Sequence, residues 1–307
     1  MTVKHIALVG CGDWGRHILR ELKTLGAHVT VVAIDDATVT RARDGGADAI
    51  VDRIGSLPQD IDGAVIAAST NAHTECVLAL AAWDIPIFVE KPLAASVGEA
   101  RRVVREVGNR VFVMHKWQYH PGIERLREIV ADGRLGAPIG FRSVRLGWAM
   151  PHDGLEPIWT LLPHDLSIVL HIFGSIPTPR EAFADPLGPP GGGLFARLGG
   201  NGEPNVVIEV SSFHPLVRRS IILACENGVA QLGDGYDDEV VLRVGAPGSR
   251  AAIEERLTAK GPMPLLRELE VFLGYLDGGP PPLSTAAEGC AVVETIAALR
   301  RMAGLPE

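Results

Sequence analysis

The sequence has few of the features that mark secreted, membrane or metal-binding proteins. Its four cysteines are scattered and form no Cys-x-x-Cys pair or close Cys/His cluster, so we expect reduced thiols, no disulfide framework and no metal site. No run approaches the roughly 18 apolar residues that a membrane span needs. The first strand begins by about residue 4 and leaves no room for a signal peptide. We therefore expect a cytoplasmic protein without a membrane partner.

Basic residues are scarce relative to acidic ones. The 307 residues include 29 lysines and arginines against 37 aspartates and glutamates, which gives a formal net charge of -8. Nucleic-acid binding needs a basic footprint, and no dense basic run is present, so nucleic acid is not an expected partner. A hydrophobic share of 47% with 21% charged residues indicates a globular protein. The length suits two domains of about 150 residues each.

Three glycines near the N-terminus carry the first functional signal. Gly10, Gly12 and Gly15 have the Gly-x-Gly-x-x-Gly spacing, directly after the strand-forming run His5–Val9 and before a helical pattern. In dinucleotide-binding folds the first glycine allows a tight turn, the second lets the backbone approach a pyrophosphate, and the third lets helix and strand pack closely. The helix N-terminus also offers N–H groups and a partial positive charge to phosphates. The alternative is a glycine-rich turn in an ordinary βαβ unit.

Two aspartates favour NAD over NADP as the cofactor. The next strand, at 28–34, ends at Asp35 and Asp36. Asp35 comes about 20 residues after Gly15, where a carboxylate hydrogen-bonds the ribose 2′-hydroxyl of NAD. The two carboxylates would repel a 2′-phosphate, and the arginines Arg41 and Arg43 come only later in the sequence.

Apolar strands alternate with helical patterns through the first 120 residues. This alternation predicts an α/β fold with a doubly wound parallel sheet, that is, a dinucleotide-binding Rossmann domain over residues 1–120. The expected strands are at 64–68, 85–89 and 111–114, and the expected helices are at about 72–83 and 97–107.

The second half has longer alternating strands that no helix separates. It predicts an α+β domain over residues 121–307, with an open, largely antiparallel sheet; its closing helices can pack back on the first domain. The expected strands are at 141–148, 205–213, 220–224 and 239–244, the helices at about 121–132, 161–173, 263–276 and 286–302, and a flexible hairpin connection at 187–193.

Polar segments follow three of the parallel strands, at the edge where such a sheet binds ligands. Ser69, Thr70 and Asn71 follow the strand at 64–68, with His73 one turn into the next helix. These side chains can contact the cofactor. The alternative for Ser69 or Thr70 is a helix N-cap, because hydroxyl and amide side chains are preferred there.

Glu90, Lys91 and Pro92 follow the buried strand at 85–89. A lysine at this place can reach the nicotinamide and hydrogen-bond the oxygen that gains or loses a proton as hydride moves. Pro92 would fix the following turn. A structural salt bridge between the two charged side chains is the competing interpretation.

The third segment, 115–121, leads out of the last parallel strand. Its aromatic side chains, Trp117 and Tyr119, either line the substrate site or pack beneath it, and the residue types alone favour packing.

These segments together resemble one family. The glycine turn with Asp13 and Trp14, the 69–73 segment, Glu90-Lys91-Pro92, the 119–121 exit and the closing 264–269 and 278–280 segments are similar to the Gfo/Idh/MocA oxidoreductase superfamily, and the similarity runs through nearly the whole chain. The resemblance implies a Rossmann domain, an open α/β domain whose sheet often mediates oligomers, and hydride exchange between NAD(P) and a carbohydrate, cyclitol or related compound. It makes Lys91 the substrate-contacting lysine and gives Glu90 a part in seating the nicotinamide.

The family's acid/base element, an aspartate followed four residues later by a histidine, is only half present. His164 falls at the histidine position and is a credible general acid/base, whereas Thr160 replaces the aspartate. A hydroxyl cannot replace a carboxylate as a proton acceptor, but it can bind a sugar hydroxyl or cap a helix. Asp165 can orient a ring or pair with a cation. Gln118 stands where the family often has arginine, which suits a neutral substrate or altered packing.

The leading hypothesis is an NAD-dependent dehydrogenase that interconverts a secondary alcohol and a ketone of a sugar, cyclitol or related polyol, as a homodimer or homotetramer. The alternatives are an imine, enone or tetrapyrrole reductase on the same scaffold, or a dinucleotide-binding sensor without turnover. The predicted catalytic residues are Lys91 and His164. The predicted cofactor-binding residues are Gly10, Gly12, Asp13, Trp14, Gly15, Asp35, Asp36, Ser69, Thr70, Asn71, His73, Glu90 and Lys91. The predicted substrate-binding residues are Trp117, Gln118, Tyr119, Thr160, His164 and Asp165.

Overall fold

The computed structural model describes residues 3–148, 155–246 and 249–306, which form two compact units. The first unit comprises residues 1–116 and 263–293, and the second comprises 117–262 and 294–307. The chain therefore returns to the first unit near its C-terminus, and the division between the units falls within the last helix. No described helix is long and apolar enough to cross a membrane.

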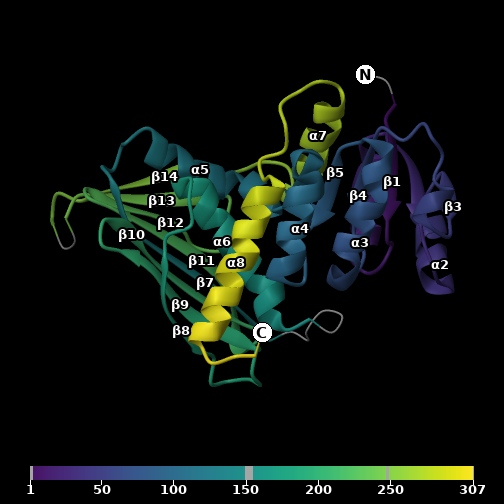
Figure 1. The fold of residues 1–307 in the computed structure, drawn as a ribbon. Coiled ribbons are helices and arrows are strands. Elements are labelled where there is room, and N and C mark those ends of the chain that lie inside the picture. The colour runs from purple at the N-terminus through teal and green to yellow at the C-terminus, as the bar shows by residue number, and fades with distance from the viewer. Residues whose placement is uncertain (1–2, 149–154, 247–248, 307) are drawn as a thin grey trace. The chain divides into compact units, whose positions relative to one another are not determined.

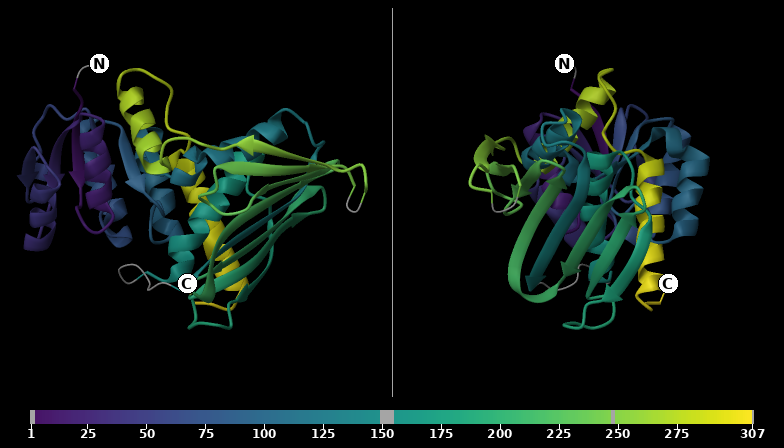
Figure 2. Two further views of the ribbon diagram at one scale, coloured as in Figure 1. Left: turned by 180° about the vertical axis from the view of Figure 1, so that it is seen from behind. Right: turned by 90° about the vertical axis from the view of Figure 1, so that its left-hand side faces the viewer.

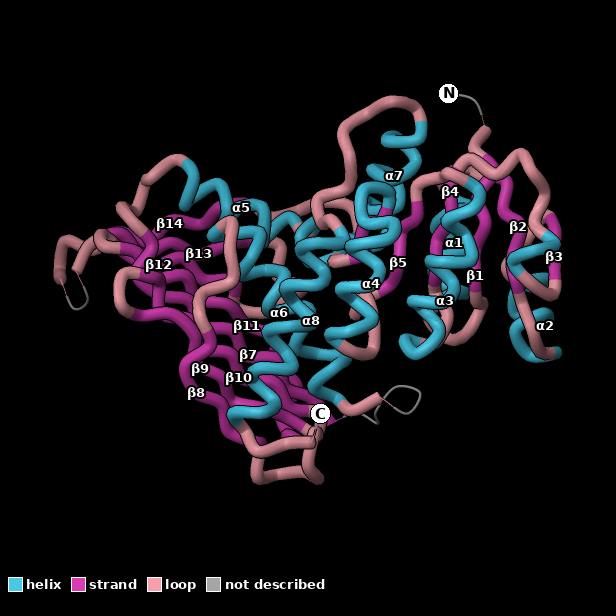
Figure 3. Tube along the Cα trace, viewed as in Figure 1, coloured by secondary structure: helices cyan, strands magenta, loops and turns pink. Residues whose placement is uncertain are grey.

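The first unit is built on a six-stranded parallel sheet in the order β3-β2-β1-β4-β5-β6 (Figure 1). This is the strand order of a Rossmann fold, so the predicted doubly wound sheet is confirmed. Helix α1 contacts α2 and α7, while α3 contacts α4, and these helices flank the sheet (Figure 3). The strands are β1 His5–Val9, β2 His28–Val32, β3 Ala49–Val51, β4 Gly63–Ile66, β5 Ile87–Glu90 and β6 Val111–Met114. The helices are α1 Gly15–Thr24, α2 Asp36–Asp44, α3 Thr70–Leu80, α4 Val97–Val107 and α7 Pro264–Leu276, with short 3₁₀ helices η1 Ile54–Ser56, η2 Ala81–Trp83 and η3 Gly108–Arg110.

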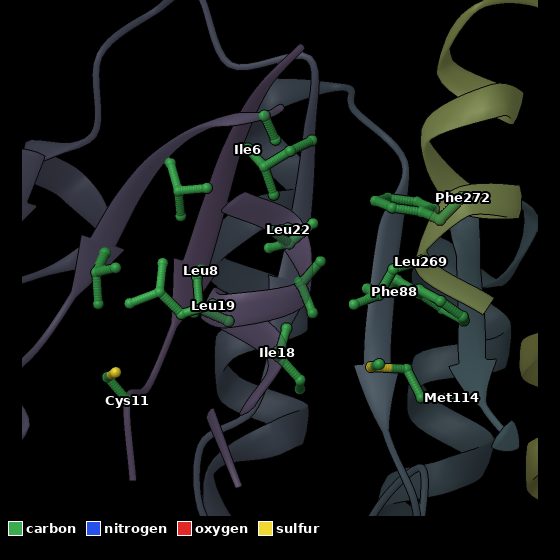
Figure 4. Close-up of a cluster of buried hydrophobic side chains, with 14 of the residues drawn as sticks. Ile6, Leu8, Cys11, Ile18, Leu19, Leu22, Phe88, Met114, Leu269 and Phe272 are labelled. Atoms are coloured by element: carbon green, nitrogen blue, oxygen red, sulfur yellow. The ribbon is translucent and has the colours of Figure 1, made fainter. Parts of the chain in front are cut away.

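The core of this unit explains why α7 belongs to it. The sheet strands are buried nearly throughout, as expected for a parallel sheet covered on both faces. Leu265, Leu269 and Phe272 of α7 join the same buried cluster as Phe88 of β5 (Figure 4). The rings of Phe88 and Phe272 stack with their centroids 5.1 Å apart. Burial of these large apolar side chains fixes α7 against the sheet.

The second unit contains an eight-stranded sheet in the order β14-β13-β12-β11-β7-β10-β9-β8. All neighbouring strands are antiparallel except β10 and β7, which run parallel, so the prediction of a largely antiparallel sheet is confirmed. The strands are β7 Pro138–Trp148, β8 Pro179–Ala184, β9 Gly193–Gly200, β10 Glu203–Ser211, β11 Phe213–Cys225, β12 Gly228–Leu232, β13 Glu239–Val244 and β14 Ile253–Thr258. The helices are η4 Lys116–Tyr119, α5 Pro121–Ala131, α6 Pro157–Phe173 and α8 Ala286–Met302, the last shared with the first unit.

One face of this sheet is covered and the other is open. Helices α5 and α6 pack on it, and alternate residues of β9 and β10 are buried and exposed, which is the pattern of a sheet with one solvated face. The right-hand view of Figure 2 shows the strands with no described helix in front of them. The open face carries ion pairs such as Arg197 with Glu181.

Several elements differ from the sequence expectation. Helix α6 starts at Pro157 rather than 161, because proline is tolerated in the first turn of a helix. Strand β11 starts at Phe213 rather than 220. The predicted connection at 187–193 links the antiparallel strands β8 and β9. The sequence analysis missed β3, β8, β9, β12 and β14, together with α2.

Candidate active site

The three glycines of the turn between β1 and α1 differ in how much room a side chain would have at each position. Gly10 has a φ of +94°, and a side-chain carbon there would lie 2.8 Å from the Ala67 carbonyl oxygen. A side-chain carbon at Gly15 would collide with the Gly10 carbonyl oxygen. At Gly12, by contrast, such a carbon would meet nothing within 4 Å among the described residues. Gly10 and Gly15 are therefore required by the turn itself, whereas Gly12 leaves open space above it.

The first turn of α1 suits an anionic ligand. Trp14 occupies the N-cap position without a side-chain cap bond, and the first turn contains no acidic residue. A helix start of this kind presents backbone N–H groups and a partial positive charge. A pyrophosphate over the glycine turn would gain from both.

Asp35 is the N-cap of α2. Its Oδ1 accepts a hydrogen bond from the Thr38 amide at 2.8 Å, and the Thr38 side chain bonds back to complete a capping box. This amide hydrogen bond lowers the pKa of Asp35. The exposed carboxylate is thus held in place and ionised at neutral pH. Asp36 begins α2 itself.

Arg41 contacts the glycine turn from α2. Its guanidinium lies 3.3 Å from Oδ1 of Asp13. The sequence analysis noted only that Arg41 comes later in the chain than the two aspartates, whereas helix α2 brings its side chain back to the glycine turn. Sequence distance alone could not show this contact.

The segment after β4 contains both exposed and buried polar side chains. Ser69 is the N-cap of α3, but its hydroxyl makes no cap bond. Thr70 is buried and Asn71 is exposed. The ring nitrogens of buried His73 lie 3.0 Å from the Pro92 carbonyl and 3.1 Å from the Ala68 carbonyl. Burial lowers the pKa of His73 to about 4, so the ring is neutral at pH 7 and its single N–H donates to one of these two carbonyls.

Glu90 is the centre of a cluster at the end of β5. Its Oε1 accepts a hydrogen bond from the indole N–H of Trp14, and its Oε2 accepts one from the Lys91 backbone N–H at 3.0 Å. The Lys116 ammonium lies 4.3 Å from the Trp14 ring centroid. Burial raises the pKa of Glu90, while the charges of Lys91 and Lys116 oppose the rise.

This cluster follows from the order of the strands. Strands β1, β4, β5 and β6 are parallel neighbours, so the residues that follow them lie at one edge of the sheet. The structure thereby brings together the glycine turn, the 69–73 segment, Glu90 with Lys91, and Lys116. Ligands of open α/β sheets bind at this edge.

The second unit holds a separate polar cluster on α6 and β7. Asp165 is fully buried, and Arg145 Nε and Nη2 lie 2.7 and 3.2 Å from its two carboxylate oxygens. The Ser143 hydroxyl donates a further hydrogen bond to it. The Arg145 guanidinium lies 4.8 Å from the Trp117 ring centroid, and the His164 ring meets Trp117 edge-on at 6.4 Å. The cation that pairs with Asp165 is therefore Arg145.

The remaining predicted substrate residues are largely committed to packing. Trp117 and Tyr119 are 5% and 3% exposed. The buried Gln118 amide donates to the Ser167 carbonyl at 3.2 Å. The Thr160 hydroxyl donates to the Pro157 carbonyl at 3.0 Å, within the first turn of α6.

Comparison with known proteins agrees with this architecture. Residues 4–115 match the family model GFO_IDH_MocA, described as an oxidoreductase family with an NAD-binding Rossmann fold. The chain is 25% identical to the inositol 2-dehydrogenase of Mycolicibacterium smegmatis over 269 residues. The matched region covers 81% of this chain and 76% of the relative. Residues 4–115 are thus similar to the NAD-binding domain of this oxidoreductase family.

Further relatives show a similar relation. The chain is 29% identical over 184 residues to inositol 2-dehydrogenase 2 of Saccharopolyspora erythraea, with 55% of this chain and 54% of that one covered. Several curated relatives are thus matched over about half of their length. The fold is that of an oxidoreductase from Agrobacterium radiobacter solved with NAD+, L-tartaric acid and magnesium, with a TM-score of 0.85, 19% identity and 99% and 97% of the chains covered.

Two charged residues of the first unit were absent from the predicted site. Lys116 was part of the exit segment but received no role. Glu268 lies fully buried on α7, among the apolar positions Leu265, Leu269 and Phe272. A glutamate on the apolar face of a predicted helix was the signal that could have identified it. Among the described residues, no group of three or more His, Cys, Asp or Glu side chains could hold a metal ion.

Proposed function

We propose that the protein is an NAD-dependent dehydrogenase that transfers hydride between nicotinamide and a secondary alcohol or ketone of a sugar, cyclitol or related polyol. The observation that carries the proposal is the hydrogen bond that joins Trp14 of the glycine turn to Glu90, next to Lys91. This hydrogen bond connects the glycine turn, which suits a diphosphate, to the end of β5, where Lys91 can bind the reacting oxygen of a substrate. Both segments belong to the first unit. The inositol 2-dehydrogenase relatives support the substrate class.

Three features support NAD rather than NADP. Asp35 is ionised and fixed by its capping box, and its carboxylate can accept a hydrogen bond from a ribose 2′-hydroxyl. The same charge would repel a 2′-phosphate, and Asp36 adds a second negative charge. Arg41, the nearest competing cation, is paired with Asp13.

Lys91 stabilises the reacting oxygen in this proposal. NAD+, when bound, supplies the hydride acceptor. The Lys91 ammonium polarises the substrate oxygen as the alcohol loses its proton, because a positive charge stabilises developing alkoxide character. Glu90 and His73 hold the backbone on either side of Lys91 in place. Ser69, Thr70 and Asn71 contribute to the cofactor-binding edge after β4.

His164 takes the hydroxyl proton in alcohol oxidation and returns it in ketone reduction. An imidazole suits this role because its unperturbed pKa lies near neutrality. Asp165 is held by Arg145 and Ser143, so the neighbouring carboxylate is committed to structure. Trp117, Gln118, Tyr119 and Thr160 would shape the substrate-binding region through packing, because the two rings are buried and the Gln118 amide and the Thr160 hydroxyl donate to backbone carbonyls.

The test compares Lys91→Ala with Lys260→Ala, a control at an exposed lysine. NADH and NADPH binding is measured by fluorescence titration, and NADH oxidation is measured with a panel of cyclitol and sugar ketones. We expect wild type and both variants to bind NADH more tightly than NADPH. Lys91→Ala should lose roughly 10²- to 10⁴-fold in kcat/KM, and Lys260→Ala should not. Full activity in Lys91→Ala, or no affinity of the wild type for either dinucleotide, would refute the proposal.

A second candidate is an imine or enone reductase on the same scaffold. The observation that favours it is the absence of a carboxylate at position 160, where the Thr160 hydroxyl is used within α6. Cyclic imines and enones added to the same panel distinguish the two reactions. A protein that binds NADH but turns over none of these compounds would be a sensor instead.

We also propose that the open face of the second sheet mediates a homodimer or homotetramer. Phe183, Phe195 and Val207 are 63%, 37% and 41% exposed there, and apolar side chains grouped on a sheet face are typical of interfaces. Sedimentation equilibrium tests this proposal, and a monomer at micromolar concentration would refute it.

A further inference from the structure

The feature that the proposed reaction leaves unexplained is Glu268. Its side chain is fully buried in the first unit, and neither carboxylate oxygen has a hydrogen-bond partner among the described residues. A carboxylate in such a place is unfavourable unless it is paired or protonated. A residue of this kind therefore needs a functional or electrostatic reason.

The helix places Glu268 at the ligand-binding edge of the sheet. Leu269 and Phe272 of α7 pack on Phe88 and Met114 (Figure 4), and Glu268 adjoins Leu269 on the same buried side. Its carboxyl group lies close enough to Glu90 and Lys116 for both to act on it electrostatically. Glu268 thus belongs to the cluster that contains Trp14 and Lys91.

The two buried carboxyl groups differ in their hydrogen-bond donors. The Glu90 carboxylate receives one N–H from Trp14 and one from the Lys91 backbone, and both bonds favour its charged form. Glu268 has no such donor among the described residues. Two like charges this close cannot both ionise readily, so a single proton resides on the carboxyl group without donors.

We propose that Glu268 is a positioning residue that holds a proton in the resting protein. Glu90 is then the one anion of the cluster, and it orients Trp14 and the Lys91 backbone. A proton on Glu268 removes one negative charge from the cluster, which favours a diphosphate and the developing alkoxide.

The surrounding charges agree with this assignment. Burial and the negative charge of Glu90 raise the pKa of Glu268 well above its ordinary value, and Lys116 opposes the rise. A further titratable group on which Lys91 acts is His115, which stays neutral because burial and Lys91 lower its pKa to about 3. Arg267 and Glu270 of α7 are exposed.

The inference rests on the proposed function for its effect on NADH, but the proton itself is measured without any ligand. Carbon-13 NMR of protein labelled at the glutamate carboxyl groups is recorded from pH 4 to pH 9. The signal that disappears in Glu268→Gln identifies this residue. We expect it to titrate well above the exposed glutamates, and titration together with them would overturn the proposal.

The effect on the site is measured by NADH titration of wild type, Glu268→Gln and the exposed control Glu270→Gln. Glutamine has the shape of the protonated acid, so below the titration midpoint that the NMR series gives for Glu268 all three proteins should bind NADH equally. Above that midpoint the wild type and Glu270→Gln should bind roughly tenfold more weakly than Glu268→Gln, because an added charge near the ligand is worth about that much. Equal pH dependence in all three proteins would overturn the electrostatic role. If no protein binds NADH while the NMR signal titrates as expected, the proposed function fails and the protonated Glu268 stands.

Discussion

The indole N–H of Trp14 donates a hydrogen bond to the carboxylate of Glu90. The two residues are 76 positions apart in the sequence, yet they join the turn after β1 to the end of β5. Each residue also has a place in its own element: Trp14 is the N-cap of α1, and Glu90 is the last residue of β5. Together they make the position of the Lys91 backbone depend on the glycine turn.

Loss of this hydrogen bond should weaken both folding and cofactor binding. Trp14→Phe removes the N–H donor but keeps an aromatic ring beneath Lys116. Since Glu90 is buried, we expect the free energy of unfolding to fall by about 2 kcal/mol and NADH affinity to fall with it. Trp148→Phe, at an exposed tryptophan, serves as the matched control. Denaturant unfolding of both variants checks the prediction, and equal stability would contradict it.

Alanine substitutions at Gly12 and Gly10 should affect different properties, NADH affinity in the first case and stability in the second. An added methyl group at Gly12 meets nothing within 4 Å, whereas one at Gly10 collides with the Ala67 backbone at an unfavourable φ. Gly12→Ala should therefore unfold like the wild type but bind NADH at least tenfold more weakly, about 1.4 kcal/mol or more. Gly10→Ala should be destabilised directly.

The control for these variants is Gly55→Ala, at an exposed glycine with equally open surroundings. It should change neither quantity. Calorimetric binding and thermal unfolding distinguish the cases. Unchanged NADH affinity in Gly12→Ala would show that no diphosphate approaches this turn.

Local spacing was sufficient to predict the Rossmann unit. The glycine turn, the strand-end aspartate and the Glu90-Lys91 pair are all set by a few consecutive residues, and their common edge follows from parallel strand order. The contacts of Arg41 with Asp13 and of Trp14 with Glu90 could not be predicted in this way. They join residues whose proximity depends on how whole elements pack.

The second unit was less predictable for a related reason. Strands β8 and β9 pair across a proline- and glycine-rich connection, and β10 pairs with β7 in parallel. Such pairings depend on long-range register rather than on a local pattern. Arg145 was missed because an arginine within a strand looks like a solvated residue until its partner, Asp165, is known.

Acid should destabilise the protein through its buried neutral histidines. Burial lowers the pKa of His115 to about 3, whereas an unfolded histidine titrates near 6.5. Between these values the unfolded state binds more protons, so stability is fully present above pH 6.5 and is lost as pH falls. At pH 5 the loss from one such histidine is about 2 kcal/mol.

The variant that tests this origin is His115→Asn, whose amide can still bond the Ser284 hydroxyl. Its unfolding free energy should fall less between pH 7 and pH 5 than that of the wild type, by about that same 2 kcal/mol. His28→Asn, at an exposed histidine, should follow the wild type. If all three proteins lose stability in parallel, His115 does not control the acid response.

The buried Arg145–Asp165 pair should behave differently from an exposed pair on the same sheet. Removing one partner leaves an uncompensated buried charge, so Asp165→Leu or Arg145→Met alone should cost about 3–5 kcal/mol of unfolding free energy. The double variant should lose less than either single variant, because apolar side chains can replace a buried pair when both charges go. Glu181→Gln and Arg197→Gln, in the exposed pair, should each cost much less, since water screens that interaction. A double-mutant cycle by urea unfolding measures both couplings. If the two couplings proved equal, Asp165 would not depend on Arg145, and the packing of Trp117 against the guanidinium would need another explanation.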